Sequence, residues 1–593
     1  MQTVSQEWKD KQNELLVPES FVEVSLTLTD PDAYKDATAE DNGAIYISNT
    51  EQIVSEVDKE IIPYATLEQN LWVLNGSRVI VPSSNYGDCG YIGNTLCNKN
   101  CVFESLPIVT INFPQVNNLL IPGVTITWGT AYDEYAVDFT VTAYNGGAVV
   151  ATKTVTGNTN VTSIVALDII KYNRITISIS KWSLPYRRAR IAEILPGAIK
   201  TYTKRELFSY EHSQDVDPIS ASLPKSEISF SIDNVDNSYN PNNLESLAKY
   251  LIERQEVKSR CGYKIGENIE WVNCGTFYMS EWDAPQGGMT ANFKARDLLE
   301  FMTNTYYYGV YSPNGKSLYD LALAVLIDAD LPLSDNGVVK WVIDDSLKNI
   351  YTVAPLPVDT HANCLQLIAN AGGCVMYQDR IGVLHIEPFV RTETDYAITH
   401  FNSYSKPETT LVKPLKQVDV PCYSYSISAD SSELYKGTIN VNGTTNLTIT
   451  YSGAATNVSA NVSGGTLASA TYYANACVLT ITAKGNVTIT VTGNSLETSS
   501  VKVVTASGAT GETISVDNPL ITSQDRAIAI GKWVESYMKN RMIINSNWRA
   551  DPRLDALDVV NNENDYNTNK VVMTSVKYSY NGAFKGSGEG RVI

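Results

Sequence analysis

Histidine and cysteine side chains are best able to act as nucleophiles, general bases or metal ligands near neutral pH, and in this chain they are few and scattered. The four histidines, His212, His361, His385 and His400, include no pair at i,i+4 spacing and no HExxH motif, so a metalloprotease centre is not indicated. His385 alternates with apolar residues in the stretch Val383–Ile386, which favours a structural place in a strand.

The nine cysteines are odd in number and dispersed, a pattern typical of a reduced compartment rather than a disulfide framework. Cys89, Cys97 and Cys101 cluster, but their spacing lacks a paired CxxC motif and a neighbouring histidine. Cys364 follows His361 closely, but it opens an apolar helix and lacks papain-type surroundings. We therefore expect no catalytic residue, no bound cofactor and no metal site.

Oxygen-bearing side chains crowd into residues 233–243, which read Asp-Asn-Val-Asp-Asn-Ser-Tyr-Asn-Pro-Asn-Asn. Such a run could bind calcium, but it lacks the Gly and the terminal Glu of an EF-hand loop. Asn and Asp side chains readily cap turns of their own backbone, so a capped turn is predicted here. Asp555 and Asp558 are interpreted in the same way, as turn residues rather than a paired acid and base.

Aromatic residues suggest binding rather than catalysis. Trp128, Tyr132 and Tyr135 lie in one short stretch with polar neighbours. An apolar ring can stack on the face of a pyranose while polar neighbours hydrogen-bond its hydroxyl groups. These three residues are the candidate glycan contacts, although core packing explains Trp128 equally well.

The charge balance argues against nucleic-acid binding. The 593 residues include 45 basic and 64 acidic ones, a net charge of −19, whereas a phosphate footprint needs clustered Lys and Arg. An acidic surface keeps a protein soluble and could repel DNA that must slide past. The stretch Met1–Asp10 lacks the apolar core of a signal peptide, and no run approaches the ~18 apolar residues of a membrane span. We expect a protein made in the cytosol.

Hydrophobic patterning predicts mostly β structure. In residues 64–195, short alternating stretches recur between Gly, Asn and Pro turns, which predicts a β-sandwich. Residues 429–510 repeat this alternation in a Thr- and Ser-rich setting and predict an immunoglobulin-like sandwich. Apolar residues at helical spacing in 317–326 and 364–371 predict two helices of a small α+β domain over 304–410.

Two distant parts of the chain read as matching pieces of one small β-barrel. The first part comprises Ile228–Asn243, Val272–Trp282 and Ala291–Leu299, and the second comprises Ile543–Val560 and Val571–Tyr580. A chain that carries a barrel twice and shows no catalytic constellation is expected to build a tube or a ring.

These parts resemble the tail hub proteins of bacteriophages, also called baseplate hub or tail-tip proteins. The phrases similar to the first barrel of such hubs are Phe230–Asn243, Gly275–Trp282 and Ala295–Leu299, and those similar to the last barrel are Asn518–Ile521, Asp551–Val559 and Tyr578–Gly588. Two further phrases, Tyr64–Ser77 and Arg190–Ile194, resemble the opening and closing of discoidin-like jelly rolls in prophage tail proteins.

The resemblance implies a multidomain, mainly β protein with two hub barrels, a small α+β middle domain, an inserted jelly-roll sandwich and an inserted immunoglobulin-like sandwich. The expected division is an N-terminal arm and the start of the first barrel at 1–63, the discoidin-like insertion at 64–195, the rest of the first barrel at 196–303, the middle domain at 304–410, the start of the second barrel at 411–428, the immunoglobulin-like insertion at 429–510 and the rest of the second barrel at 511–593.

The resemblance also implies a noncatalytic virion protein, assembled in the host cytoplasm and located at the distal end of the tail. Hubs of this family are homotrimers, and three copies with two barrels each match a sixfold tail tube. The protein would close that tube and form the DNA exit channel, and inserted domains would contact host cell-wall glycan. Expected partners are a distal tail or tail tube protein, a tape measure protein, and a needle or tail fibre. A glycan-binding surface adhesin and a tail-associated cell-wall hydrolase are the alternatives.

Overall fold

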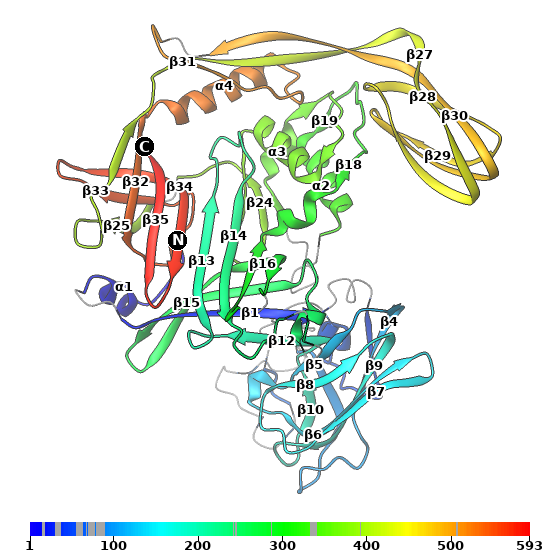
Figure 1. Cartoon of the computed structure of the whole chain (residues 1–593), viewed down its shortest axis with the longest axis vertical. Helices are drawn as coiled ribbons and strands as arrows, with labels where there is room; N and C mark the ends of the chain where they lie inside the picture. Colours follow the sequence, from blue (N-terminus) through cyan, green and yellow to red (C-terminus); the bar gives the residue numbers. More distant parts are fainter. Residues whose placement is uncertain are drawn as a thin grey trace.

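A computed structural model describes the chain except for residues 15–17, 30–36, 55–62, 67, 69–70, 72–77, 79–88, 241, 244–245, 286–287, 332–340, 392 and 506–507. The predicted fold class, a multidomain and mainly β protein, is confirmed. Figure 1 shows two barrels side by side, a sandwich at the bottom in blue and cyan, and a long ribbon at the top in yellow and orange.

The two barrels share one continuous sheet of 13 strands. Barrel I consists of β1 (Ser20–Thr29), β12 (Gly197–Tyr202), β13 (Leu207–Asp215), β14 (Lys225–Asp233), β15 (Glu256–Ile265), β16 (Asn268–Asp283) and β17 (Thr290–Arg296). Barrel II consists of β25 (Glu393–Ile398), β26 (Glu408–Leu411), β32 (Met542–Arg549), β33 (Val559–Glu563), β34 (Thr568–Tyr580) and β35 (Phe584–Val592). The order β12-β1-β15-β16-β17-β14-β13 continues directly into β34-β35-β32-β26.

The sheet of barrel I curls around buried side chains, which are continuous with those of barrel II. Inward-facing residues alternate along its strands, as in β14, where Ile228, Phe230 and Ile232 are buried. Tyr210 of β13 reaches Ser259 of β15 across the interior, with 3.1 Å between their hydroxyl oxygens. Because β14, β17 and β16 separate these two strands in the sheet, the contact shows that the sheet bends back on itself.

Barrel II is closed by the segment 393–411. Its first part, β25, pairs in parallel with β33, and its last part, β26, pairs with β32. Between them, the Tyr404 amide donates to the Asn547 carbonyl at 2.9 Å and the Arg549 amide donates to the Asn402 carbonyl at 2.7 Å. The segment therefore crosses from β33 to β32 and joins the two sides of this barrel.

Both barrels repeat one strand arrangement. In barrel I, β14 is followed by the meander β15-β16-β17, and β17 pairs back with β14. In barrel II, β32 is followed by the meander β33-β34-β35, and β35 pairs back with β32. A further antiparallel strand flanks the first one on its other side, β13 beside β14 and β26 beside β32.

Local irregularities repeat as well. Arg254 and Leu557 each precede the second strand of this unit, with φ angles of 67° and 73° that are uncommon for residues other than glycine. The Arg254 amide donates to the carbonyl of Met279 at 2.8 Å, and the Leu557 amide donates to that of Met573 at 2.7 Å. A β-bulge follows each methionine. The two parts matched in the sequence therefore share topology and detailed backbone geometry.

The segment between β1 and β12 forms a sandwich of two antiparallel sheets. One sheet contains β2 (Thr38–Asp41), β4 (Ile108–Asn117), β9 (Tyr172–Trp182), β6 (Ala136–Asn145) and β7 (Ala148–Val155), and the other contains β11 (Glu193–Leu195), β5 (Ile121–Thr127) and β8 (Thr162–Ile169). A pair, β3 (Tyr91–Leu96) with β10 (Arg188–Ile191), completes it. Because β2 already pairs with β4, the sandwich begins near residue 38 rather than at 64.

The middle domain carries the two predicted helices, α2 (Leu318–Ala329) and α3 (His361–Gly372). They pack beside β20 (Trp341–Ile343), β23 (Val375–Gln378) and β24 (Leu384–Glu387). The domain ends earlier than the expected residue 410, because β25 and β26 pair with barrel II. The remaining short elements are α1 (Gln6–Gln12), η1 (Thr50–Val54), η2 (Thr130–Tyr132), η3 (Leu247–Tyr250), η4 (Leu298–Thr303), η5 (Asp345–Asn349), β18 (Thr305–Tyr306), β19 (Lys316–Ser317), β21 (Tyr351–Thr352) and β22 (Asp359–Thr360).

A long two-stranded ribbon of β27 (Leu415–Thr450) and β30 (Ala476–Thr505) extends from the middle domain. Helix α4 (Gln524–Met538) packs against its base. Residues 411–428 were expected to open the second barrel, but β27 pairs with β30 and β31 (Glu512–Ser515) in a separate sheet. At the far end, β28 (Ala455–Ser463) and β29 (Thr466–Tyr472) both pair with β30. The strands described there thus form one curled sheet around a small core, whereas an immunoglobulin-like sandwich has two sheets.

Candidate functional site

The junction of the barrels is a strand pair within one chain. β13 of barrel I pairs antiparallel with β34 of barrel II from Tyr210 opposite Tyr580 to Asp215 opposite Ser575. The backbone hydrogen bonds of this seam fix the two barrels edge to edge, so neither rotates freely against the other. The sheet passes from one barrel to the next without a break.

A buried histidine lies in the seam. His212 of β13 is 1% exposed, and neither ring nitrogen has a hydrogen-bond partner among the described residues. Its ring contacts Phe277 and Tyr578, with centroids 5.4 and 6.2 Å apart. Burial and the nearby Arg380 lower the pKa of His212 to about 3, so the imidazole is neutral in the folded protein.

His212 should make the stability of the folded protein depend on pH. The unfolded histidine takes up a proton below pH ~6.5, whereas the folded one stays neutral to about pH 3. Stability is therefore complete above pH ~6.5 and falls toward pH 3, by about 2 kcal/mol at pH 5. Urea unfolding of His212→Leu should lack this part of the dependence. Parallel pH profiles for the variant and the original protein would contradict the assignment.

One guanidinium joins the middle domain to both barrels. Arg380, in the turn between β23 and β24, is 5% exposed. Its Nε donates to Asp555 Oδ1 at 2.6 Å, its Nη1 to the Asn273 carbonyl at 2.8 Å and its Nη2 to the Leu554 carbonyl at 3.0 Å. Asn273 belongs to β16 of barrel I, while Leu554 and Asp555 follow β32 of barrel II. The side chain thus fixes three parts of the molecule at one point.

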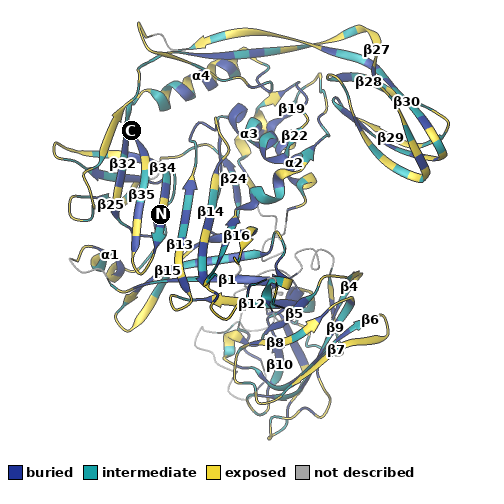
Figure 2. Ribbon diagram, in the orientation of Figure 1, coloured by how far each residue is buried: buried dark blue, intermediate teal, exposed yellow. Residues whose placement is uncertain are grey.

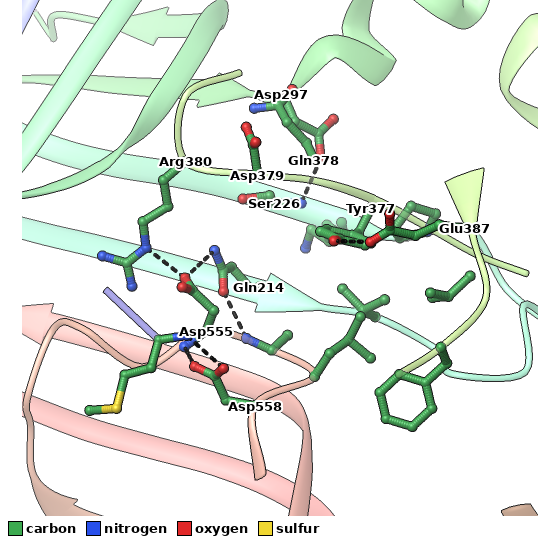
Figure 3. A pocket seen from close by; sticks show the side chains of 18 of the residues that line it. Gln214, Ser226, Asp297, Tyr377, Gln378, Asp379, Arg380, Glu387, Asp555 and Asp558 are labelled. Atoms are coloured by element: carbon green, nitrogen blue, oxygen red, sulfur yellow. Dashed lines mark hydrogen bonds and ion pairs between the residues drawn. The ribbon is translucent and has the colours of Figure 1, made fainter. Parts of the chain in front are cut away.

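A cavity of about 280 Å³ lies beside Arg380, at the meeting of the middle domain and the two barrels. Figure 3 shows several of the polar groups lining it joined by hydrogen bonds or ion pairs. Asp555 also accepts from Gln214 at 3.3 Å, and Tyr377 donates to Glu387 at 2.6 Å. With these groups engaged in hydrogen bonds, the cavity marks a structural junction rather than a site prepared for chemistry.

Burial also affects a carboxyl group at the edge of this cavity. Asp297 accepts hydrogen bonds from the amides of Leu299 at 3.0 Å and Ser226 at 2.8 Å. Burial nonetheless raises the pKa of Asp297 to about 7. The side chain caps η4 and the end of barrel I, which explains the position without a catalytic role.

The outward face of the sheet is polar across the seam. In Figure 2 the strands of this region alternate between buried residues and half-buried or exposed ones. Two rows of outward residues cross five strands, first Lys294, Ser229, Glu211, Ser579 and Lys585, then Arg296, Glu227, Ser213, Lys577 and Ser587. Ion pairs join the two rows, as Lys577 Nζ of the second row lies 2.6 Å from Glu211 Oε1 of the first, and Lys294 Nζ of the first lies 3.5 Å from Glu227 Oε2 of the second. The ten residues are thus four basic, two acidic and four serine side chains, and each glutamate lies beside a lysine of the other row.

The three predicted glycan contacts lie in the sandwich but in different environments. Trp128 is 0% exposed and donates its Nε1 hydrogen to Ser163 at 2.8 Å. Its ring packs within the core, so it is not available to a sugar, and the prediction for this residue is wrong. Tyr132 lies under the guanidinium groups of Arg78 and Arg190, at 4.9 and 4.5 Å from its ring centroid.

The remaining candidate, Tyr135, is half-buried at the same end of the sandwich, and its amide donates to Ser183 Oγ at 3.1 Å. The contacts of Tyr132 and Tyr135 neither support nor contradict sugar binding. Glycan contact through these two residues therefore stays a prediction.

A buried ion network at this end was not predicted. Arg190, 2% exposed, binds Glu68, and its Nη1 lies 3.6 Å from Glu134 Oε2. Glu134 also accepts from Trp182 Nε1 at 2.8 Å and lies 3.0 Å from Arg187 Nε. Burial raises the pKa of Glu134, whereas the charge and hydrogen bonds of Arg190 outweigh burial and lower that of Glu68. This network joins the N-terminal segment of the sandwich, which contains Glu68, to its C-terminal segment, which contains Arg190.

The other residues considered in the sequence have structural contacts. Cys89 donates to the Ile47 carbonyl at 2.9 Å and Cys97 to that of Leu184 at 3.1 Å. Among the described residues, no group of three or more His, Cys, Asp or Glu side chains is placed to hold a metal ion. The predicted capped turn at 233–243 is confirmed, since Asn234 accepts from the Tyr239 amide at 2.9 Å. Within the part of the chain that is described, no helix is long and apolar enough to span a membrane.

Comparison with known proteins finds distant structural likeness only. No protein family and no curated protein matches the chain. The 43 kDa tail protein of prophage MuSo2 from Shewanella oneidensis is 10% identical, with 66% of this chain and 95% of that chain covered at a TM-score of 0.36. A tail protein from Neisseria meningitidis MC58 is 9% identical, with 67% of this chain and 94% of that chain covered at a TM-score of 0.35. Prophage tail protein gp18 from Listeria monocytogenes EGD-e is 9% identical, with 66% of this chain and 91% of that chain covered at a TM-score of 0.35. At these sequence identities and TM-scores, the structural likeness assigns neither a family nor a function to this chain.

Proposed function

We propose that this protein is a noncatalytic hub of a bacteriophage tail, in which three copies form a ring at the distal end of the tail tube. The observation that carries the proposal is the repeated barrel within one continuous sheet. A chain with two equivalent barrels presents six similar units when three copies surround an axis, which removes the mismatch with a sixfold tube. The sandwich and the ribbon, which Figure 1 shows at the bottom and the top of the molecule, then project away from the ring.

The polar rows across the seam support a role as a channel wall. In the proposed ring they face the axis, where DNA passes. Glu211 and Glu227 lie beside Lys577 and Lys294, and Glu281 and Glu300 lie beside Arg296, so most of the basic charge is offset and the phosphate backbone is held only weakly. We propose a tail tube or distal tail protein as the partner on one side of the ring, and a tape measure protein, needle or fibre at its centre.

Labelling of virions tests the location. Gold-labelled antibodies against the purified protein should mark the distal tip of the tail in electron micrographs. Label on the head, label along the whole tail or its absence from virions would overturn the proposal. Light scattering should give three chain masses for the purified protein, and gel-shift assays should show no retention of double-stranded DNA.

The glycan role is a separate part of the proposal and is confined to the end of the sandwich that carries Tyr135. Replacing Tyr135 with alanine should reduce retention of the protein on host cell walls at least tenfold if its ring stacks on a sugar. The matched control is Tyr144→Ala, in the same sandwich beside Arg174, where the ring centroid lies 4.3 Å from the guanidinium carbon. Equal retention of both variants would remove glycan contact from the account.

A further inference from the structure

Strand β13, which forms the seam within the chain, has a counterpart in barrel II, strand β26, whose outer edge is unpaired among the described residues. β26 flanks β32 as β13 flanks β14, with Thr409 opposite Ile544 and His212 opposite Ile228. The two isoleucines occupy equivalent positions. Ile544 lies opposite Gly590, which lies opposite Met573, and Ile228 lies opposite Ala295, which lies opposite Met279. All four residues of β26 are exposed. In the described part of the chain, no strand pairs with the outer edge of β26.

The receiving edge of the seam also has a counterpart. Within the chain, β13 pairs with the part of β34 that follows Met573. The equivalent part of β16 follows Met279 and includes Trp282 and Asp283, which pair with β17 on one side. On the other side, β15 stops at Glu256 opposite Tyr278. Among the residues described, no backbone group pairs with that side of Trp282 or Asp283, so this edge is open as well.

We propose that β26 of one copy pairs antiparallel with the end of β16 in a second copy, in the register that β13 and β34 use within the chain. His212 faces Tyr578 and Gln214 faces Val576 in the internal seam. Transferred to the equivalent positions, Thr409 faces Ala284 of the second copy and Leu411 faces Trp282. The inference rests on the proposed ring and names the contact that closes it.

Two observations favour a second copy as the occupant. β26 ends the strand order in barrel II, whereas β16 belongs to barrel I on the other side of the seam, so one molecule presents both halves of the contact. Leu411 is 63% exposed and Trp282 is 37% exposed, and the transferred register brings these two large apolar side chains together. Pairing would bury both and would cover two strand edges that otherwise invite uncontrolled association.

The seam between copies differs from the internal seam in its charges. Inside the chain, Glu211 and Lys577 form an ion pair at 2.6 Å. The equivalent residues between copies are Glu408 and Asp283, which are both acidic. Like charges across neighbouring strands repel, so the external seam is the weaker one and opens first. Glu408→Lys places opposite charges at these two positions, with the signs of the internal pair reversed, and should tighten the oligomer.

Cross-linking tests the register directly. Leu411→Cys and Trp282→Cys in one chain, oxidised after assembly, should give a species of three chain masses on a nonreducing gel. Each single variant should remain one chain. The matched control combines Trp282→Cys with Val501→Cys, an exposed apolar position on the ribbon (61%) that should not cross-link.

Sedimentation of two charge variants separates this inference from the proposed function. Leu411→Asp should weaken self-association at least tenfold, and Glu408→Lys should strengthen it severalfold. A closed trimer that neither cross-links nor responds to Leu411→Asp would overturn the register and leave the hub proposal standing. A chain that stays monomeric at every concentration would overturn both. Cross-linked polymers of no fixed length would keep the seam and overturn the ring of three.

Discussion

Replacing Arg380 with methionine should lower the free energy of unfolding by about 3–5 kcal/mol. The guanidinium is 5% exposed and donates to Asp555 and to the carbonyls of Asn273 and Leu554. Methionine fills a similar volume, so the loss comes from a buried carboxylate and two acceptors left without donors. Urea unfolding followed by intrinsic fluorescence should show the change.

The loss should be localised as well as large. Hydrogen exchange in Arg380→Met should quicken in the turn between β23 and β24 and near Asn273, because these parts are held together by the missing side chain. Lys577→Met is the matched control, since its ion pair with Glu211 is exposed on both sides (45% and 41%) and should contribute less than 1 kcal/mol. Equal effects of the two substitutions would show that Arg380 does not join the domains.

Replacing Arg190 with methionine should destabilise the sandwich by a similar amount, about 3–5 kcal/mol at pH 7. Its side chain is 2% exposed. The guanidinium forms an ion pair with Glu68 and lies 3.6 Å from Glu134 Oε2. Without it, two buried carboxylates face each other with less compensating charge. The fluorescence of Trp182, which donates to Glu134, reports this region.

The effect of Arg190→Met should shrink on acidification. Loss of the positive charge raises the pKa of both carboxyl groups in the folded variant, so the folded state takes up protons at a higher pH than the unfolded state does. Stability lost at pH 7 should therefore be partly regained at pH 5. Arg174→Met, on the surface over Tyr144, is the control and should cost less than 1 kcal/mol at either pH. A loss that does not depend on pH would contradict the network.

The sequence predicted the repeated barrel because its signals are local. Alternation in the stretch around Ile228 and in the stretch around Ile544 places one face of each strand in a core, and the structure buries both residues. Helices α2 and α3 were predicted for the same reason, as their apolar residues recur at helical spacing. The bulges after Met279 and Met573 carry no such signal and appear only in the fold.

Pairing between distant segments could not be predicted. Residues 411–428 were assigned to the second barrel from the resemblance to tail hubs, but β27 pairs with β30 and β31 in a separate sheet. Arg380 lies in a tight turn, where an exposed position is expected, and its burial depends on strand β16 and on the loop after β32, both more than a hundred residues away in sequence. Trp128 shows the converse difficulty, because an aromatic residue near a loop looks the same in sequence whether it binds a ligand or packs in the core.

Electron cryomicroscopy of the purified oligomer tests the central claim most directly. If barrels I and II are sister units, the map should show three copies whose six barrels surround an open axis, with the sandwiches and ribbons outside. The strand β26 should lie against the end of β16 in the adjacent copy. A map with another number of copies, or with the barrels turned away from a common axis, would contradict the account.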